Sequence, residues 1–381
     1  MENKFADLCP YTQEEIAPAV KRIAQSEHFE KMAAFVFPDR KVEDVRQMVA
    51  NITCTDDFQA KVMSELNNRI IQKSIRNFTY DGLQHIDPSK GYLFVSSHRD
   101  VMLDSALLQQ ILFNNGLRTT EITFGSNLMM SQLIVDIGKS NKMFTVVRGA
   151  GMKDFYKNSL LLSEYIRDTV TQRHESVWIA QRNGRTKDGN DATDQGIIKM
   201  FQMSGTSDVV QSISELNIVP MVVSYQIEPC DLLKTKEIYI KKKEGKYEKP
   251  AGEDFISLMQ GLMDPKGDVD ITICEPVRKE ELNFPNLTNA NDFFKNVASL
   301  IDKRILAKYR LSNNNYIAHD LRSGNNQYAK HYTAADKTLF LQRYHAALNL
   351  PFEDKDLLSS IFLGIYANAV DNTSADQTAA N

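Results

Sequence analysis

The stretch Gly91-Tyr-Leu-Phe-Val-Ser-Ser-His98-Arg-Asp100-Val-Met-Leu-Asp104-Ser-Ala-Leu-Leu108 is the basis for interpreting the rest of the chain. Its apolar run Tyr92–Val95 predicts a buried strand, and residues 105–113 predict the first turns of a helix. A histidine and two carboxylates lie between them, at the end of a strand, where an open α/β sheet places its chemistry. A histidine can titrate near neutral pH, and a carboxylate on its second ring nitrogen would orient it. His98 is therefore a candidate general base.

Simpler interpretations of these residues stay open from the sequence alone. Asp104 could be the N-cap of the helix, because Asp is a favoured capping residue, and Arg99 could pair with Asp100 at the surface. The triplet His-Arg-Asp also opens the catalytic loop of protein kinases. Here Ser105 occupies the place of the metal-binding Asn of that loop, and no Asp-Phe-Gly follows. A kinase is therefore excluded.

Composition, charge and residue spacing narrow the classes of protein to which this chain could belong. The 381 residues are 42% hydrophobic and 25% charged, which is ordinary for a globular protein. A net charge of -4 gives no reason to expect a nucleic-acid partner. The four cysteines and seven histidines show no metal-ligand spacing, so no metal is expected. No signal-peptide pattern and no apolar run near the roughly 20 residues of a membrane span are found. We expect a cytoplasmic protein, or one peripheral on the inner face of the membrane.

Four regions are predicted along the chain. Residues 1–77 show four amphipathic stripes, the first opened by a Thr12/Glu15 capping box, and indicate an N-terminal helical bundle. Residues 78–310 alternate short apolar runs with helical patterns, which predicts an α/β fold with a mainly parallel mixed sheet covered by helices. Residues 311–370 form a C-terminal helical extension, and the small polar end 371–381 is expected to be disordered. The predicted strands are Tyr92–Ser97, Thr120–Phe124, Met143–Val147, Val177–Ala180, Ile218–Tyr225, Glu237–Ile240 and Val269–Cys274.

Two further stretches combine a strand end with cations. Arg148 ends an apolar strand and is followed by glycines 149 and 151, a pattern that can present a guanidinium and backbone amides to an anion. After the strand 177–180, three cations fall within six residues of a Gly-containing loop, which suits a phosphate clamp, although a solvated loop would look the same. The residues of that loop are Arg182, Gly184, Arg185 and Lys187.

Two other segments are easier to explain structurally. Val219-Pro220 lies near the start of an apolar strand, a position where a missing amide is tolerated. Residues 241–249 form a lysine-rich hairpin or loop, which is either a solvated excursion or a contact to anionic lipid headgroups.

In their order and spacing, these stretches resemble the glycerolipid acyltransferase superfamily. Its signature is a His and an Asp separated by four residues, then a strand ending in Arg, a Gly-Thr-Arg-type loop and a Val-Pro strand. The matching residues here are His98 with Asp104, Phe144 to Arg148, Gly184-Arg185 and Val219-Pro220. The sequence around Trp178 is most similar to soluble plastid-type glycerol-3-phosphate acyltransferases, which also join an N-terminal helical bundle to an α/β domain.

The match has two departures. Five residues separate His98 from Asp104, so either Asp104 or Asp100 could supply the carboxylate. Asn183 stands where many members of the family have Glu, which leaves the acceptor open.

The resemblance implies O-acyl transfer in phospholipid biosynthesis. His98 would take the proton of an acceptor hydroxyl, which attacks an acyl thioester directly, so Ser96 and Ser97 would form no acyl-enzyme and would instead hold the strand end. Arg148 and the cations of the loop 182–187 would bind the phosphate of glycerol-3-phosphate or a related polar acceptor.

The expected partners are a coenzyme A or acyl carrier protein thioester, a polar lipid precursor and a membrane surface, with no resident cofactor. Lysophosphatidate or an N-acyl amino acid is the alternative acceptor. A lipid-binding module that has lost catalysis is the alternative from a different class.

Overall fold

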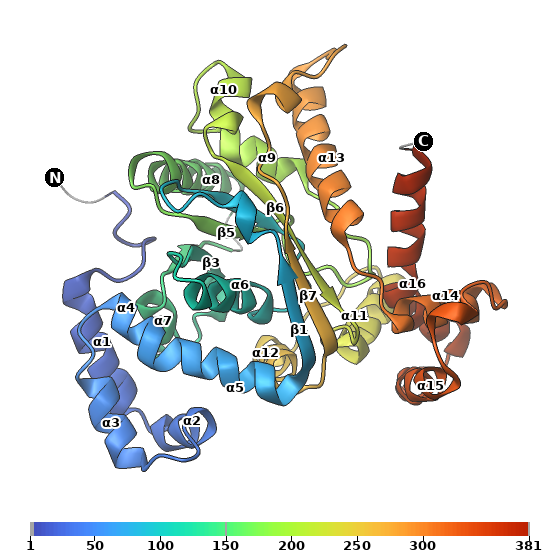
Figure 1. Cartoon of the computed structure of the whole chain (residues 1–381), viewed down its shortest axis with the longest axis horizontal. Coiled ribbons are helices and arrows are strands. Elements are labelled where there is room, and N and C mark those ends of the chain that lie inside the picture. Colours follow the sequence, from blue (N-terminus) through green and yellow to red (C-terminus); the bar gives the residue numbers. More distant parts are fainter. Residues whose placement is uncertain (1–3, 149–150, 380–381) are drawn as a thin grey trace.

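The computed structural model describes residues 4–148 and 151–379. It has an α/β fold built on a seven-stranded sheet with the order β1-β7-β6-β2-β5-β3-β4 (Figure 1). Every neighbouring pair is parallel except β6 with β7, which confirms the predicted mainly parallel mixed sheet. The strands are β1 (Ile75–Asp81), β2 (Leu93–Ser96), β3 (Glu121–Gly125), β4 (Met143–Val146), β5 (Val177–Ala180), β6 (Ile218–Tyr225) and β7 (Gly267–Ile273).

The strand β2 is buried on both faces because its side chains alternate between two hydrophobic cores. Leu93 and Val95 pack with helices on one face of the sheet, and Phe94 packs with helices on the other. The first group of helices is α8 (Met152–Arg167), α9 (Gln195–Gln202), α10 (Val209–Ser214) and α13 (Ala290–Lys308). The second is α5 (Ser64–Ser74) and α6 (Leu103–Asn114).

The N-terminal helices share a core of their own, which also contacts α7 (Gln132–Ser140). The Thr12/Glu15 capping box is present at the first helix, where the Glu15 carboxylate accepts the Thr12 amide at 2.8 Å. The helical region ends at Ser74, because residues 75–77, predicted as helical, already belong to the edge strand β1. The hydropathy of the sequence does not reveal β1, because most of its side chains are exposed. The strand is held by pairing with β7. The helices are α1 (Gln13–Gln25), α2 (Phe29–Val36), α3 (Val42–Ala50) and α4 (Thr55–Phe58).

One prediction about the second half of the chain is wrong. Residues 237–240 are not a strand but lie within α11 (Asp231–Glu244), whose buried residues Asp231, Thr235 and Tyr239 recur every fourth position. The segment predicted as a tail from residue 371 overlaps the end of α16 (Lys355–Ala379). Asp371 holds this helix by an ion pair with Arg322 at 2.6 Å. Residues 380–381 of the predicted tail lie outside the described residues.

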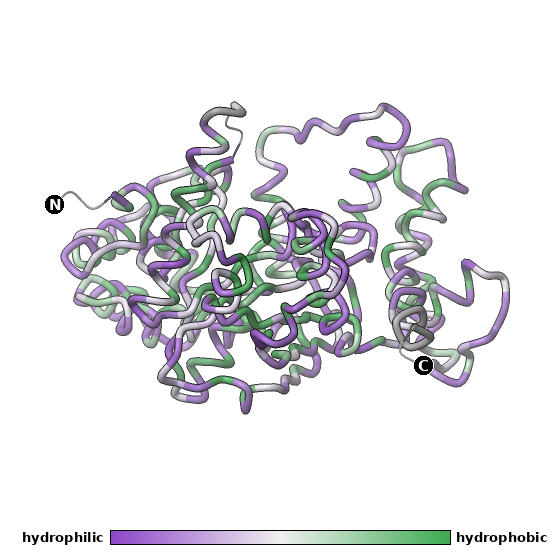
Figure 2. Tube along the Cα trace, turned by 90° about the horizontal axis from the view of Figure 1, so that it is seen from above, coloured by the Kyte–Doolittle hydropathy of each residue, from purple (hydrophilic) through white to green (hydrophobic). Residues whose placement is uncertain are grey.

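Of the remaining helices, two pack against α16 and one packs against α5. Figure 2 shows that hydrophilic residues dominate the projecting loops, while hydrophobic residues lie mostly on the inward stretches. These helices are α12 (Glu253–Met263), α14 (Asn313–Ser323) and α15 (Ala334–Leu348).

Candidate active site

The residues of the 91–108 stretch meet at an edge where neighbouring parallel strands end. β2 lies between β5 and β6, and its last residue, Ser96, is in register with Ala180 and Met221. His98 follows two residues later, and its carbonyl accepts the backbone amide of Thr186 at 2.7 Å. The loop that carries His98 is thereby joined to the loop that the sequence predicts to bind phosphate.

Asp104 is the carboxylate that contacts His98. Its Oδ2 lies 3.0 Å from Nδ1 of His98 and accepts the backbone amides of Arg99 and Asp100 at 2.7 and 2.9 Å, while its Oδ1 accepts the Tyr225 hydroxyl at 2.7 Å. Burial alone would raise the pKa of Asp104, but the hydrogen bonds and the charge of His98 outweigh it and hold this pKa below its ordinary value. With Nδ1 donating to the carboxylate, Nε2 is the ring nitrogen left to accept a proton.

Asp100, the other candidate carboxylate, accepts hydrogen bonds from backbone amides instead. Its Oδ1 accepts the amides of Met102 and Leu103 at 3.0 and 2.8 Å, at the start of α6. Its Oδ2 is buried with no hydrogen-bond partner among the described residues. Burial, and then the charge of Asp104, raise the pKa of Asp100. The five-residue spacing therefore joins His98 to Asp104, which lies inside α6 and is not its N-cap.

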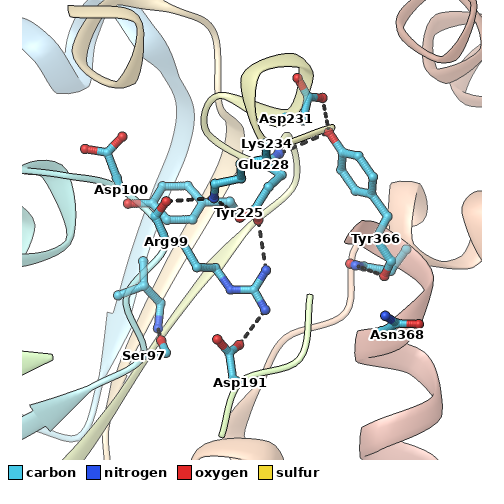
Figure 3. Close-up of polar contacts among 12 residues, drawn as sticks. Ser97, Arg99, Asp100, Asp191, Tyr225, Glu228, Asp231, Lys234, Tyr366 and Asn368 are labelled. Carbon is cyan, nitrogen blue, oxygen red and sulfur yellow. Dashed lines mark hydrogen bonds and ion pairs between the residues drawn. The ribbon is translucent and has the colours of Figure 1, made fainter. Parts of the chain in front are cut away.

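Arg99 belongs to a buried ion-pair network behind this loop (Figure 3). Its guanidinium contacts Asp191, and its Nη1 lies 2.8 Å from Glu228. Lys234 donates to the same Glu228 carboxylate at 2.6 Å and to the Arg99 carbonyl at 2.8 Å. Two cations balance two carboxylates, the condition under which buried charges are tolerated. The alternative interpretation, a surface ion pair between Arg99 and Asp100, is therefore wrong. Arg99 instead helps to hold the backbone of the loop.

The network continues into the C-terminal helices. The Glu228 amide donates to the Tyr366 hydroxyl at 3.2 Å, and that hydroxyl donates to Asp231 at 2.6 Å (Figure 3). Arg343 completes the chain by an ion pair with Asp231. The helices α15 and α16 are in this way connected to the loop after β2, far from it in the sequence.

Asp302, beside the network, gives a testable pH dependence. It accepts the amide and hydroxyl of Thr193 at 2.8 and 2.6 Å, and burial, together with the charge of Asp191, raises its pKa to about 6. The folded protein therefore keeps a proton that the unfolded chain releases above its ordinary pKa of 3.8, so stability falls as pH rises from about 4 to 6. Asp302→Asn is expected to remove this loss and add about 1–3 kcal/mol at pH 7, measured by thermal unfolding at several pH values.

A matched control lies on the same helix. Hydrogen bonds from Thr288 lower the pKa of Asp292, so Asp292→Asn is expected to decrease stability at neutral pH. An Asp302→Asn variant that melts at the same temperature as the wild type at pH 7 would contradict the assignment.

A cavity of about 290 Å³ opens beside His98. Its polar part contains four cations, Arg148, Arg185, Lys187 and Lys249, and one acid, Asp254. Because the cations come from the end of β4, the loop after β5 and the segment before α12, the fold gathers them from separate parts of the sequence. An excess of positive charge in a concave site favours an anionic ligand.

The contacts of these cations differ. Arg148 donates to the side chain of Asn183, and Lys187 pairs with Glu237. Nη1 of Arg185 is buried and has no hydrogen-bond partner in the described part of the chain. A buried charged donor without an acceptor is costly, so this nitrogen of Arg185 is free to donate to an anionic ligand in the cavity.

The other residues predicted in the two cationic loops differ in whether they line the cavity. Gly184 lines the cavity with a positive φ of 77°, which favours glycine. Arg182 is not among the residues that line it. Of the glycines predicted after Arg148, residue 149 lies outside the described residues.

Apolar side chains also line the cavity. They include Ile122, Phe124, Met143 and Trp178. The ring of Trp178 meets that of His98 edge-on, with centroids 5.6 Å apart. The cavity is thus lined by a histidine, by cationic side chains and by apolar side chains.

Ser96 and Ser97 are engaged in the scaffold, as expected from the sequence. The Ser96 hydroxyl donates to the Ser97 carbonyl at 2.7 Å, and the Ser97 hydroxyl accepts the Val223 amide at 3.0 Å. Both residues are fully buried. The Ser97 hydroxyl holds the end of β2 against β6, and the Ser96 hydroxyl bonds within its own chain segment.

Several important residues were missed by the sequence patterns. Tyr225 ends β6 at the same edge as β2, so its position could have been inferred from parallel neighbours. Glu228 and Lys234 follow it, but nothing in their spacing indicates a pair with Arg99. Lys249 lies in a segment that was interpreted as a solvated excursion or a lipid contact.

The described residues were also compared with the requirements of a metal site and of a membrane-spanning helix. Their His, Cys, Asp and Glu side chains form no group of three or more that could hold a metal ion. Between residues 4 and 379, apart from 149–150, no helix has the length and apolar character required to cross a membrane.

The chain matches no known family model and no curated protein. Among solved structures it is similar to the 1-acyl-sn-glycerophosphate (LPA) acyltransferase PlsC from Thermotoga maritima. The TM-score is 0.37 and the identity 12%, over 78% of this chain and 97% of that one. A similarity at this level does not establish a family or an activity.

Proposed function

We propose that this protein is an O-acyltransferase that moves a fatty acyl group from a thioester to the hydroxyl of a polar, phosphorylated lipid precursor. The observation that carries the proposal is the contact between His98 and Asp104 beside a cavity that is lined by both cationic and apolar side chains. The four sequence motifs shared with glycerolipid acyltransferases support the same reaction.

The chemistry assigned to the chain is general-base catalysis. Nε2 of His98 would accept the proton of the acceptor hydroxyl as its oxygen attacks the thioester carbonyl, and the thiolate of the donor would leave. Asp104 would hold the imidazole by Nδ1 and stabilise its charged form. The hydrogen bonds of Ser96 and Ser97 favour direct transfer over an acyl-enzyme on either residue.

The two kinds of lining residue suit the two parts of such substrates. Arg185, with Arg148, Lys187 and Lys249, would hold the phosphate and bring the hydroxyl to His98, a positioning effect worth several kcal/mol in favourable cases. The apolar lining residues, Trp178 among them, would contact the acyl chain. A carboxylate in place of the phosphate would meet the same cations, so glycerol-3-phosphate, lysophosphatidate and N-acyl amino acids are all acceptors to be tested.

Arg185→Gln is expected to raise KM for a phosphorylated acceptor by about 10- to 100-fold with a smaller change in kcat, because a hydrogen bond to a charged group contributes about 1.5–3 kcal/mol. Arg182→Gln is the matched control, since Arg182 does not line the cavity. Steady-state kinetics over a range of acceptor concentrations measures both. Equal KM values for the two variants would exclude the phosphate role of Arg185.

The proposed function itself is tested by purified protein with coenzyme A and acyl carrier protein thioesters and each acceptor in turn. Product that contains the donor's acyl group on the acceptor's hydroxyl supports it, and the accepted substrate defines the enzyme. Folded protein that binds acceptor but transfers no acyl group from either donor would favour the lipid-binding module.

A further inference from the structure

The helix α12 buries small and polar residues on one face and exposes four large apolar side chains, while Leu262 packs against the core. Its buried residues are Glu253, Ser257 and Gly261, spaced four apart on one face. The side chains it exposes are large and apolar, and each is between 41% and 50% exposed. These side chains, here called the α12 apolar face, are Phe255, Ile256, Met259 and Met263. A surface helix normally buries its apolar residues, so this arrangement requires a reason.

The polar contacts of α12 hold the helix in this rotation. Glu253 accepts the Tyr247 hydroxyl and pairs with Lys236, and the Ser257 carbonyl accepts the Cys230 thiol at 3.3 Å. Gly261 faces Asp100 so closely that a Cβ atom would come within 2.1 Å of its Oδ2.

A rotation of α12 that buried its apolar face would break these contacts. It would also drive a side chain into the loop that carries His98, because that loop includes Asp100. The apolar face therefore stays directed outward.

The α12 apolar face adjoins the cavity. Asp254, the neighbour of Phe255, lines the cavity and accepts the side-chain amide of Asn127 at 3.1 Å. Two more exposed apolar side chains lie within two residues of a cavity-lining residue in the chain. Met130 lies two residues after Leu128 and is 47% exposed, and Val147 precedes Arg148 and is 49% exposed.

Positive charge accompanies this surface. Arg148 lines the cavity without a carboxylate partner among the described residues, whereas Lys249 lines it paired with Asp254. Lys241 and Lys242, in the last turn of α11 before α12, are exposed and form no ion pair with a described residue. An exposed apolar helix face flanked by cations matches the surface of a bilayer that contains anionic lipids.

We propose that the α12 apolar face docks on an anionic lipid surface and thereby brings the mouth of the cavity to the membrane. The choice of a lipid surface over a protein rests in part on the proposed function, because an acylated product is an amphiphile that partitions into bilayers. The docking itself requires no catalysis and can be measured separately.

The test is flotation of the full chain with vesicles of phosphatidylcholine alone or mixed with phosphatidylglycerol. Wild type is expected to float with the mixed vesicles. The double variant Phe255→Ser/Ile256→Ser is expected to lose about tenfold or more of its affinity, because the apolar area inserted at the interface is removed. Leu339→Ser, on α15 and 65% exposed, is the matched control and should float like wild type.

A conservative variant guards against loss of folding. Phe255→Trp keeps a large apolar side chain and adds a reporter to a chain whose only other tryptophan is Trp178. It should bind the mixed vesicles as wild type does, with a blue shift of its emission.

Three results would overturn the proposal. The first is wild type that fails to float with either vesicle, and the second is a double variant that floats as well as Leu339→Ser. The third is protection of the apolar face by acyl carrier protein but not by vesicles, which would assign the surface to a protein. Vesicle binding without acyl transfer would leave the docking standing and reject the proposed function, whereas transfer to water-soluble acceptors without vesicle binding would do the reverse.

Discussion

Replacing His98 with alanine is expected to lower the rate of acyl transfer by about 10²- to 10⁴-fold, the usual contribution of a positioned general base. The loss should fall on kcat, because the cations that line the cavity are unchanged and the acceptor still binds. Single-turnover measurements with saturating donor and acceptor report this step directly. A His98→Ala enzyme with wild-type turnover would reject the mechanism and support a function in binding.

The His98→Ala variant must also fold, which requires that the buried carboxylate of Asp104 keep hydrogen-bond partners. Asp104 keeps the Tyr225 hydroxyl and the backbone amides of Arg99 and Asp100 when the imidazole is removed. The variant should therefore fold, which thermal unfolding and acceptor binding by calorimetry can check. Mass spectrometry of wild type incubated with donor alone should show no added acyl group, since direct transfer forms no covalent intermediate.

Asp104→Asn is expected to reduce kcat by about 10²- to 10⁴-fold, because a neutral amide cannot stabilise the imidazolium that forms as His98 takes the proton. The amide has the shape of the carboxylate. Its oxygen can replace Oδ2, where the donors converge, and its NH₂ can donate to the Tyr225 oxygen. The effect should therefore be on chemistry rather than on folding. The ratio of kcat to that of wild type, from pH 6 to 9, is the measurement.

Asp100→Asn is the matched comparison, since it makes the same change four residues away. The Oδ1 of Asp100 accepts only backbone amides, and its Oδ2 has no partner among the described residues. Burial already raises the pKa of Asp100 and favours its neutral form. We expect less than a tenfold change in kcat. If Asp100→Asn were as damaging as Asp104→Asn, the assignment of a single orienting carboxylate would be wrong.

The sequence predicted the central strands well because both of their faces are buried. Val177–Ala180 and Ile218–Tyr225 begin and end in the structure as predicted, since continuous apolar runs between polar loops have few other solutions. Prediction failed where burial is partial. β1 is an exposed edge strand, and residues 237–240 alternate like a strand but pack as a helix, with Tyr239 stacked on Phe352 at 4.4 Å.

In the candidate site, too, some features could be predicted from the sequence and others could not. His98 and its carboxylates are close in the sequence, and Arg148, Arg185 and Lys187 each follow a recognisable strand, so local patterns are enough to nominate them. Local patterns cannot choose between Asp100 and Asp104, because the choice depends on how the loop bends.

By itself, the sequence determined the α/β class, the central strands and most of the charged groups that line the cavity. Only the tertiary structure decided which carboxylate contacts His98, which cations face the cavity and which way α12 turns. The physical reason is that these outcomes rest on contacts between distant segments. Tyr225 reaches Asp104, Glu228 reaches Arg99, and Gly261 lies against Asp100. Such contacts leave no periodic trace in a single chain.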